Sequence, residues 1–189
     1  MDENIMSTNV EKSFIARIAC SETRMTYFDQ HPGADVLKGS GHLLTTAHAY
    51  SRLNMMARYY NNASNNIHIV AYFRCYDDYY NIQIRSSQYF GNFFSKNADR
   101  ILGAFPPAGG DTTSFNIYNS NSELVTLDNL QGSHATVYLR ARNAGFINRQ
   151  LREDVYVYTY GDAPGDPVTF NLEILERNVD YPTSTVPYA

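Results

Sequence analysis

Short runs in which apolar and polar residues alternate recur along the chain, and turn-forming residues separate them. Such runs occupy residues 14–18, 67–70, 82–85, 137–140 and 168–172. Gly, Asn, Asp and Pro are frequent between them. Alternation with a period of two is typical of half-buried strands, and these four residue types favour tight turns. The pattern therefore predicts an all-β chain of many short strands.

Two of these runs return at a constant spacing. Ile82–Ser87 returns as Val137–Arg142, and Asp111–Ile117 returns as Asp166–Leu172, each 55 residues later. Two separate blocks that keep one spacing indicate an internal repeat. The turn residues between the blocks predict that each unit contains four short strands.

The N-terminal third repeats less regularly. Tyr60 and the apolar run after it match Tyr118 and the run that follows it at a spacing of 58 residues, and an insertion around residues 31–33 interrupts the constant spacing. Residues 45–59 are rich in Ala, Leu and Met, which predicts a short helix there. We therefore expect three units (about 12–78, 79–133 and 134–178) between an N-terminal tail (1–11) and a C-terminal tail (179–189) that lies over the surface.

Three units of four strands predict a β-trefoil with pseudo-threefold symmetry. Six of its strands close a barrel, so units that cannot bury their apolar faces alone share one core. Val137–Phe146 resembles the first hairpin of fascin-like trefoil units, in which a V-x-L-R-x-x-x-G-x-Y/F pattern recurs. Phe115 and Phe170 stand where ricin-type lectin repeats carry the Trp of Q-x-W, and the Gln is missing. This resemblance to the β-trefoil superfamily keeps the core aromatic but lacks the sugar-binding signature. A β-sandwich is the alternative, although it requires no 55-residue period.

Composition narrows the class of protein. The 189 residues are 43% apolar and 18% charged, with a formal net charge of −4. This mild charge and the absence of a Lys/Arg block argue against a nucleic-acid partner. No run approaches the length of a membrane span, and residues 1–12 lack the features of a signal peptide. We expect a cytoplasmic protein, or one secreted without a signal peptide, with Cys20 and Cys75 as reduced, buried thiols.

Catalytic chemistry finds no support in the sequence. There is no H-E-x-x-H, G-x-S-x-G or P-loop motif, and the five histidines are scattered without metal-ligand spacing. The acidic pairs Asp77-Asp78 and Glu153-Asp154 are typical of solvated turns. We therefore expect a protein that is not an enzyme and needs no metal or cofactor.

Binding chemistry is better represented, because the turns combine aromatic rings with amide, carboxylate and guanidinium groups. Rings can stack on a sugar, and the polar groups can bond to its hydroxyls. Tyr156, Tyr158 and Tyr160 alternate along one predicted strand, and they form either a stacking platform or part of the core. We predict a glycan or glycoconjugate as the ligand. A protein-binding module, such as a protease inhibitor or a cytoskeletal or receptor-binding trefoil, is the alternative. The candidate binding residues are Asp77, Asp78, Tyr79, Asn119, Asn121, Arg140, Asn143, Tyr156 and Tyr158.

Overall fold

The computed structural model describes residues 9–30, 41–46, 69–107, 110–152 and 157–188. It is all-β: 52% of it is strand, and the described part contains no helix of seven or more residues. Single 3-10 turns are η1 (Val10–Lys12), η2 (Phe28–Gln30), η4 (Asp111–Thr113) and η5 (Leu127–Asn129). The helix predicted for residues 45–59 lies outside the described residues, apart from Thr45 and Thr46, which end a strand.

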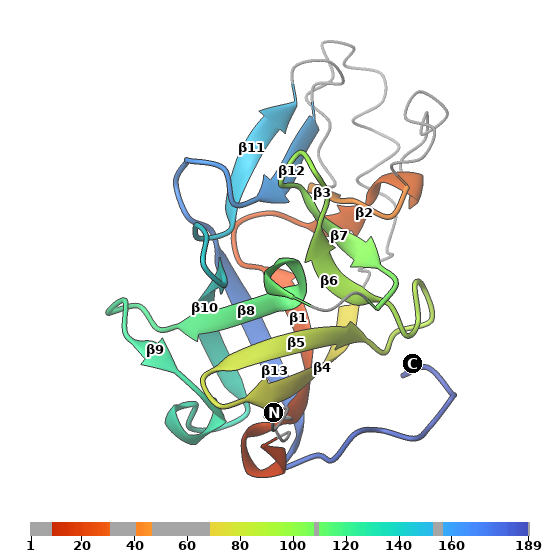
Figure 1. Ribbon diagram of the computed structural model, residues 1–189, viewed down its shortest axis with the longest axis vertical. Coiled ribbons are helices and arrows are strands. Elements are labelled where there is room, and N and C mark those ends of the chain that lie inside the picture. Colours follow the sequence, from red (N-terminus) through yellow and green to blue (C-terminus); the bar gives the residue numbers. More distant parts are fainter. Residues whose placement is uncertain (1–8, 31–40, 47–68, 108–109, 153–156, 189) are drawn as a thin grey trace, which may run out of the picture.

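Six antiparallel strands close a barrel (Figure 1). They are β1 (Phe14–Cys20), β4 (Ile69–Tyr76), β5 (Tyr79–Ile84), β8 (Ser114–Tyr118), β10 (His134–Ala141) and β13 (Thr169–Arg177). Their order is β5-β4-β1-β13-β10-β8, and β8 pairs back onto β5 through Tyr80 and Phe115. Closure leaves these six strands without an unpaired edge. A closed ring, rather than two facing sheets, therefore encloses the core.

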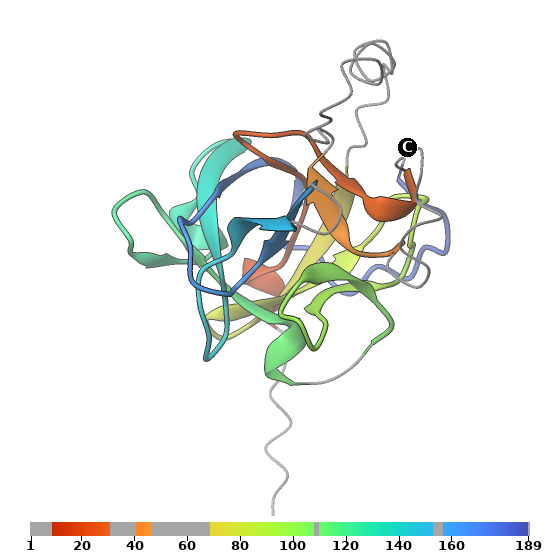
Figure 2. The same ribbon diagram turned by 90° about the horizontal axis from the view of Figure 1, so that it is seen from above.

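Three hairpins lie between barrel strands that follow one another in the chain: one between β1 and β4, one between β5 and β8, and one between β10 and β13. The hairpins gather at one end of the barrel, which Figure 2 views from above. They are β2 (Met25–Tyr27) with β3 (Leu44–Thr46), β6 (Phe93–Lys96) with β7 (Leu102–Phe105), and β11 (Asn148–Arg152) with β12 (Val157–Gly161). One short strand, β9 (Leu124–Val125), adds to the barrel strand β8. Each hairpin is bridged to the other two, through the pairs Leu43–Gly103, Ile101–Gly161 and Thr45–Thr159.

Glycine is required where the hairpins meet. A Cβ atom at Gly103 would lie 2.7 Å from the His42 carbonyl oxygen, and one at Gly161 would come closer still to the Arg100 carbonyl oxygen. Both distances are shorter than a carbon–oxygen contact allows, so any side chain would force the hairpins apart. These two glycines therefore permit the backbone bridges that close the hairpin end.

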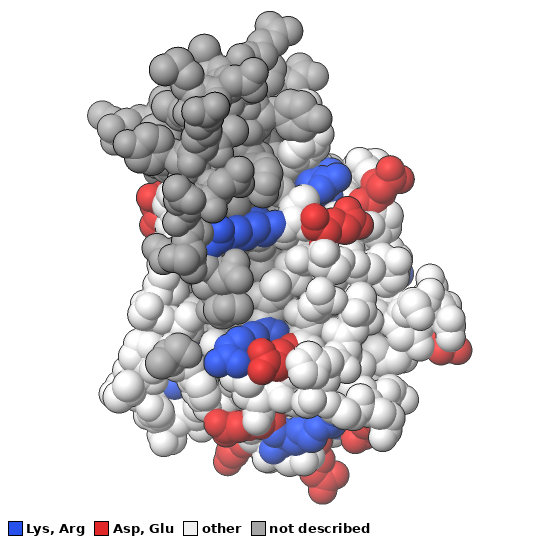
Figure 3. Space-filling view, turned by 180° about the vertical axis from the view of Figure 1, so that it is seen from behind, with Lys and Arg blue, Asp and Glu red and all other residues white. Residues whose placement is uncertain are grey.

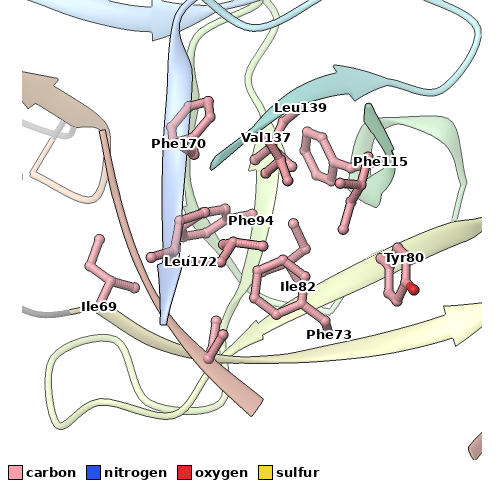
Figure 4. Close-up of a cluster of buried hydrophobic side chains, with 14 of the residues drawn as sticks. Ile69, Phe73, Tyr80, Ile82, Phe94, Phe115, Val137, Leu139, Phe170 and Leu172 are labelled. Carbon is pink, nitrogen blue, oxygen red and sulfur yellow. The ribbon is translucent and has the colours of Figure 1, made fainter. Parts of the chain in front are cut away.

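The core is built from alternate positions of the barrel strands. Their inward side chains meet inside the barrel, as the close-up in Figure 4 shows for residues of β4, β5, β8, β10 and β13, and Phe94 of the hairpin strand β6 joins them. Phe14 and Phe73 stack with ring centroids 4.5 Å apart, and Tyr80 meets Phe14 edge-on at 5.6 Å. The 55-residue repeat is carried by this pattern, because its two blocks fall on β5 and β10 and on β8 and β13.

The C-terminal tail lies along the outside of β4 and β5, and we call its residues 179–188 the C-terminal strap. Tyr72 Oη donates to the Val179 carbonyl (3.1 Å), Gln83 Nε2 donates to Tyr181 Oη (3.1 Å), and the Tyr188 N–H donates to the Arg85 carbonyl (2.8 Å). The strap packs on a small apolar cluster of Ile15, Val70 and Tyr72 on the outer barrel surface.

Several charged residues pair with residues of opposite sign. On the face in Figure 3, Lys and Arg atoms lie beside Asp and Glu atoms, with wide uncharged areas between them. Arg17 lies 3.1 Å from Glu173, and Lys12 lies 3.9 Å from Asp128. Such a surface does not concentrate charge of one sign. None of the helices in the described ranges has the length and apolar character needed to cross a membrane.

Candidate functional site

The outward side chains of β10 and its neighbours form a continuous surface. Val137 and Leu139 point into the core, so the alternate residues of β10 face outward, and β8 and β13 follow the same rule. We call this surface the β10 wall; it consists of Asn116, Tyr118, His134, Thr136, Tyr138, Arg140, Phe146, Asn171 and Glu173.

Three aromatic rings form one half of the β10 wall. The half-buried Phe146 ring meets Tyr118 edge-on at 5.1 Å and Tyr138 edge-on at 6.1 Å between ring centroids. The exposed Arg140 places its guanidinium carbon 5.5 Å from the Phe146 centroid, and its Nε donates to the Ala144 carbonyl (3.0 Å). The hydrogen bond and the cation–π contact hold the guanidinium at the rim of the rings. The predicted residue Arg140 thus lies beside one ring of this group, that of Phe146.

Tyr79 and Asp78 approach this surface from β5. The Arg142 guanidinium carbon lies 4.0 Å from the Tyr79 ring centroid, and Tyr76 stacks on Tyr79 at 5.5 Å. Only 9% of Tyr79 is exposed, so its ring is covered by side chains. Asn116 Nδ2 donates to the Asp78 carbonyl (2.9 Å) and connects β8 to the turn before β5. Through Asn116, the turn before β5 is therefore joined to the β10 wall.

The remaining predicted turn residues use their polar groups locally. Asn119 Oδ1 accepts from the backbone N–H groups of Asn121 and Glu123 (2.9 and 3.0 Å), which shapes the turn between β8 and β9. Asn143 adopts a positive φ of 57° at the end of β10 and donates to Asp111 Oδ2 (2.8 Å). Asp77 is exposed and has a φ of 60° in the turn between β4 and β5. These residues are turn formers, and the structure does not gather them around one cavity.

The alternating tyrosines divide between surface and core. Tyr160 is fully buried, lies 6.3 Å from Phe170 and shares a hydrogen bond of 2.8 Å with Thr23 Oγ1. Tyr158 is half-buried on β12, with the Arg149 guanidinium carbon 4.9 Å from its ring centroid, and Tyr156 lies outside the described residues. Of the two alternatives for these alternating tyrosines, the structure places Tyr160 in the core, whereas the ring of Tyr158 is half-buried. Tyr158 belongs to the four-stranded sheet of the hairpins, away from the β10 wall.

A pocket of about 390 Å³ lies on the other half of the β10 wall, where β1, β13 and β10 run side by side. Arg17 Nη1 donates to both carboxylate oxygens of Glu173 (3.1 Å each), and Thr136 Oγ1 donates to Asn171 Oδ1 (2.9 Å). The lining residues are Arg17, Ile18, Ala19, His134, Ala135, Thr136, Asn171, Leu172 and Glu173. None of the nine predicted binding residues belongs to this set.

Sequence reasoning missed this pocket for an identifiable reason. Arg17 and Glu173 are separated by 156 positions, and only the pairing of β1 with β13 brings them together. The sequence did contain one indication of this surface. Apolar and polar residues alternate along β10 and β13, so the polar residues of both strands must face outward. That alternation identifies the exposed face, but it does not reveal which strand lies beside it.

Nucleophilic and metal chemistry has little basis in the described residues. Cys20 and Cys75 are buried and unpaired, and burial raises the pKa of the Cys75 thiol above its ordinary value. A buried thiol with a raised pKa is a poor nucleophile. In the part of the chain that the structure describes, no group of three or more His, Cys, Asp or Glu side chains is arranged to hold a metal ion.

Neither a protein-family model, nor a curated protein, nor a solved structure was found to match the chain. The function must therefore be inferred from the arrangement and chemistry of the surface residues themselves.

Proposed function

We propose that this chain is a β-trefoil that binds carbohydrate on its β10 wall. Support for the trefoil comes from the six-stranded barrel and from its three hairpins, which follow β1, β5 and β10 in the chain. The bridges that join every hairpin to the other two add to this support. The 55-residue repeat adds to this support, because its blocks occupy equivalent strands of two units.

The observation that carries the ligand proposal is the group of three rings, one of which, Phe146, contacts Arg140. Sugar rings present apolar C–H faces that pack on aromatic side chains, and rings lose little conformational entropy when they bind. Tyr118, Tyr138 and Phe146 are held by mutual edge-on contacts, so the surface is formed before a ligand arrives. Arg140 and the tyrosine hydroxyls supply polar groups for sugar hydroxyls at the edge of the same surface.

A protein ligand is the second candidate, because the same residue types dominate protein interfaces. Tyr and Arg are enriched among the residues that contribute most to protein–protein affinity. Leu124, which is 41% exposed and pairs with Tyr118, extends the apolar part of the surface. The polar residues that continue along β10 favour the carbohydrate over the protein.

A glycan array tests the proposal directly. The folded wild-type protein should bind a defined class of glycans, and Tyr138→Ala should reduce that binding by about five- to tenfold, since one stacking contact contributes roughly 1–1.5 kcal/mol. Tyr138→Phe keeps the ring and should retain most of the binding, while Tyr158→Ala changes a tyrosine outside the wall and should have no effect.

Two results would contradict the carbohydrate proposal. One is a uniformly blank array with protein whose melting transition shows that it is folded. The other is capture of a single protein that free sugars do not displace and that Tyr138→Ala abolishes, which would establish the second candidate instead.

A further inference from the structure

The pocket beside the aromatic rings has a simple structural origin. In the register of the sheet, Glu173 lies between Arg17 and His134, and Asn171 lies between Ala19 and Thr136. Ala19 is the smallest of the outward side chains in these two rows, so the surface is hollowed above it and walled by longer polar groups. The pocket is therefore a product of strand pairing across the whole chain.

The polar groups around the pocket combine donors and acceptors. Thr136 donates a hydrogen bond to Asn171 Oδ1. This bond does not use the two amide N–H groups of Asn171 or the lone pairs of the Thr136 hydroxyl. His134 Nδ1 faces Ser133 Oγ at 3.0 Å, so its Nε2 remains as a donor or acceptor according to its tautomer. A hydroxyl group both donates and accepts, and a ligand with several hydroxyls satisfies such a mixture.

The charges around the pocket cancel. The Arg17 guanidinium is paired with the Glu173 carboxylate, with two contacts of 3.1 Å from one nitrogen. A charged ligand would have to compete with this pair for either partner, whereas a neutral polyhydroxylated ligand can bond to their remaining atoms without separating them. The pocket is thus better suited to a neutral sugar than to a phosphate, a carboxylate or an amine.

The pocket and the rings lie on one face of one strand. Thr136 and Tyr138 are two residues apart on β10 and point to the same side, and the row continues from His134 to Arg140. Six steps along a strand, at roughly 3.3 Å each, cover about 20 Å. Thr136 and Tyr138 are two of these steps apart, roughly 7 Å, and a ligand that occupies the whole row must be longer than a single sugar ring.

We infer that the pocket and the rings are two subsites for one ligand, a neutral oligosaccharide that lies along β10. Its ring faces pack on Tyr138 and Phe146, and its hydroxyls bond to Thr136 and Asn171 in the pocket. This inference rests on the proposed carbohydrate-binding function and extends it by stating the length and the charge of the ligand.

Titration calorimetry with homologous sugars tests the inference. The probes are cello-, malto- and chito-oligosaccharides, each from the monosaccharide to the hexasaccharide. Affinity of the wild-type protein for the series that binds should rise by about tenfold or more with length and then level off, because a longer ligand reaches the second subsite. The double variant Thr136→Ala/Asn171→Ala should remove this gain, so that long and short sugars bind it with about the same affinity.

Matched variants separate the two subsites. Tyr138→Ala should weaken short and long sugars alike, because it removes the aromatic subsite. Thr136→Ser keeps the hydroxyl and should preserve the gain with length. Thr136 and Asn171 are exposed, so their variants are expected to fold, and their melting temperatures check this.

Each outcome has a distinct meaning. Binding that is independent of length, or a length-dependent gain that survives in the double variant, would overturn the two-subsite inference while leaving the carbohydrate proposal intact. The absence of binding for every sugar would refute the carbohydrate proposal and this inference with it.

Discussion

Replacing Asp162 with Asn tests the ion-pair network that joins two of the hairpins. The Asp162 side chain is 0% exposed; Lys96 Nζ lies 2.5 Å from Oδ2, and Arg100 Nε lies 3.0 Å from Oδ1. Arg100 Nη2 also donates to the Asp162 carbonyl (2.7 Å). Lys96 and Arg100 flank the turn between β6 and β7, and Asp162 follows β12. The network therefore fixes the second hairpin to the third.

The expected cost of Asp162→Asn follows from the burial of the partners. Breaking a buried ion pair typically costs about 3–5 kcal/mol, because the remaining charge is left buried without a counter-charge. Lys96 is 11% exposed and bears this penalty, whereas Arg100 is half exposed and can be solvated. We expect a loss of about 3 kcal/mol in the free energy of unfolding, which corresponds to a fall of roughly 6–12 °C in melting temperature for a chain of this size.

The pH dependence gives a second signature. Burial alone would raise the pKa of Asp162, but the hydrogen bonds from Lys96 and Arg100 outweigh it and hold the pKa below its ordinary value. A carboxyl group with a lowered folded-state pKa stabilises the fold above its unfolded-state pKa, and this contribution disappears as the pH falls through the folded-state pKa. The stability difference between the wild type and Asp162→Asn should therefore be largest near neutral pH and shrink in acid.

Urea denaturation at several pH values measures both effects. Asp166→Asn is the matched control, because Asp166 is exposed in the same loop and its replacement should change stability by no more than about 0.5 kcal/mol. A loss below about 1 kcal/mol for Asp162→Asn, or a loss that does not depend on pH, would refute the reasoning.

Three further experiments test other parts of the structure. Gly161→Ala should cost about 1–3 kcal/mol, because its methyl group would collide with the Arg100 carbonyl oxygen; unchanged urea denaturation would contradict the close approach of the hairpins. A chain that ends at Asn178 loses the C-terminal strap and should lose about 2–4 kcal/mol and bind the dye ANS, since Tyr72 and its apolar neighbours become exposed; an unchanged melting temperature would show that the strap contributes nothing. Cys75 should react with a thiol reagent only when the protein unfolds, because it is 0% exposed and burial raises the pKa of its thiol; rapid labelling of the native protein would argue against this burial.

The strands could be predicted from the sequence because the core imposes a local pattern. Phe115 and Phe170 are both buried in the barrel core, on the equivalent strands β8 and β13. Because they occupy equivalent core positions, they are separated by the repeat length of 55 residues. Turn chemistry could be predicted for the same reason, since Asn143 and Asp77 adopt left-handed conformations that depend on a few neighbouring residues. Local constraints of this kind leave a record in a single sequence.

The proposed binding surface could be predicted only in part. Arg140 lies on the β10 wall, but Phe146 and Tyr118 completed the ring cluster through contacts that depend on the register of β8 with β10. The faces of β12 could not be distinguished beforehand, because Tyr158 and Tyr160 differ only in what packs against them. The composition of the ring cluster and the burial of each face of β12 both depend on which distant strands pair. A single sequence does not show this pairing directly.

Chemical-shift mapping of the protein with its tightest-binding oligosaccharide tests the central claim most directly. The proposed binding surface predicts that the largest backbone amide shifts fall on residues 134–140 of β10, with smaller ones on residues 116–118 and 171–173 of the adjoining strands. Amide shifts concentrated on the hairpin end or on the C-terminal strap would contradict a binding site on the β10 wall.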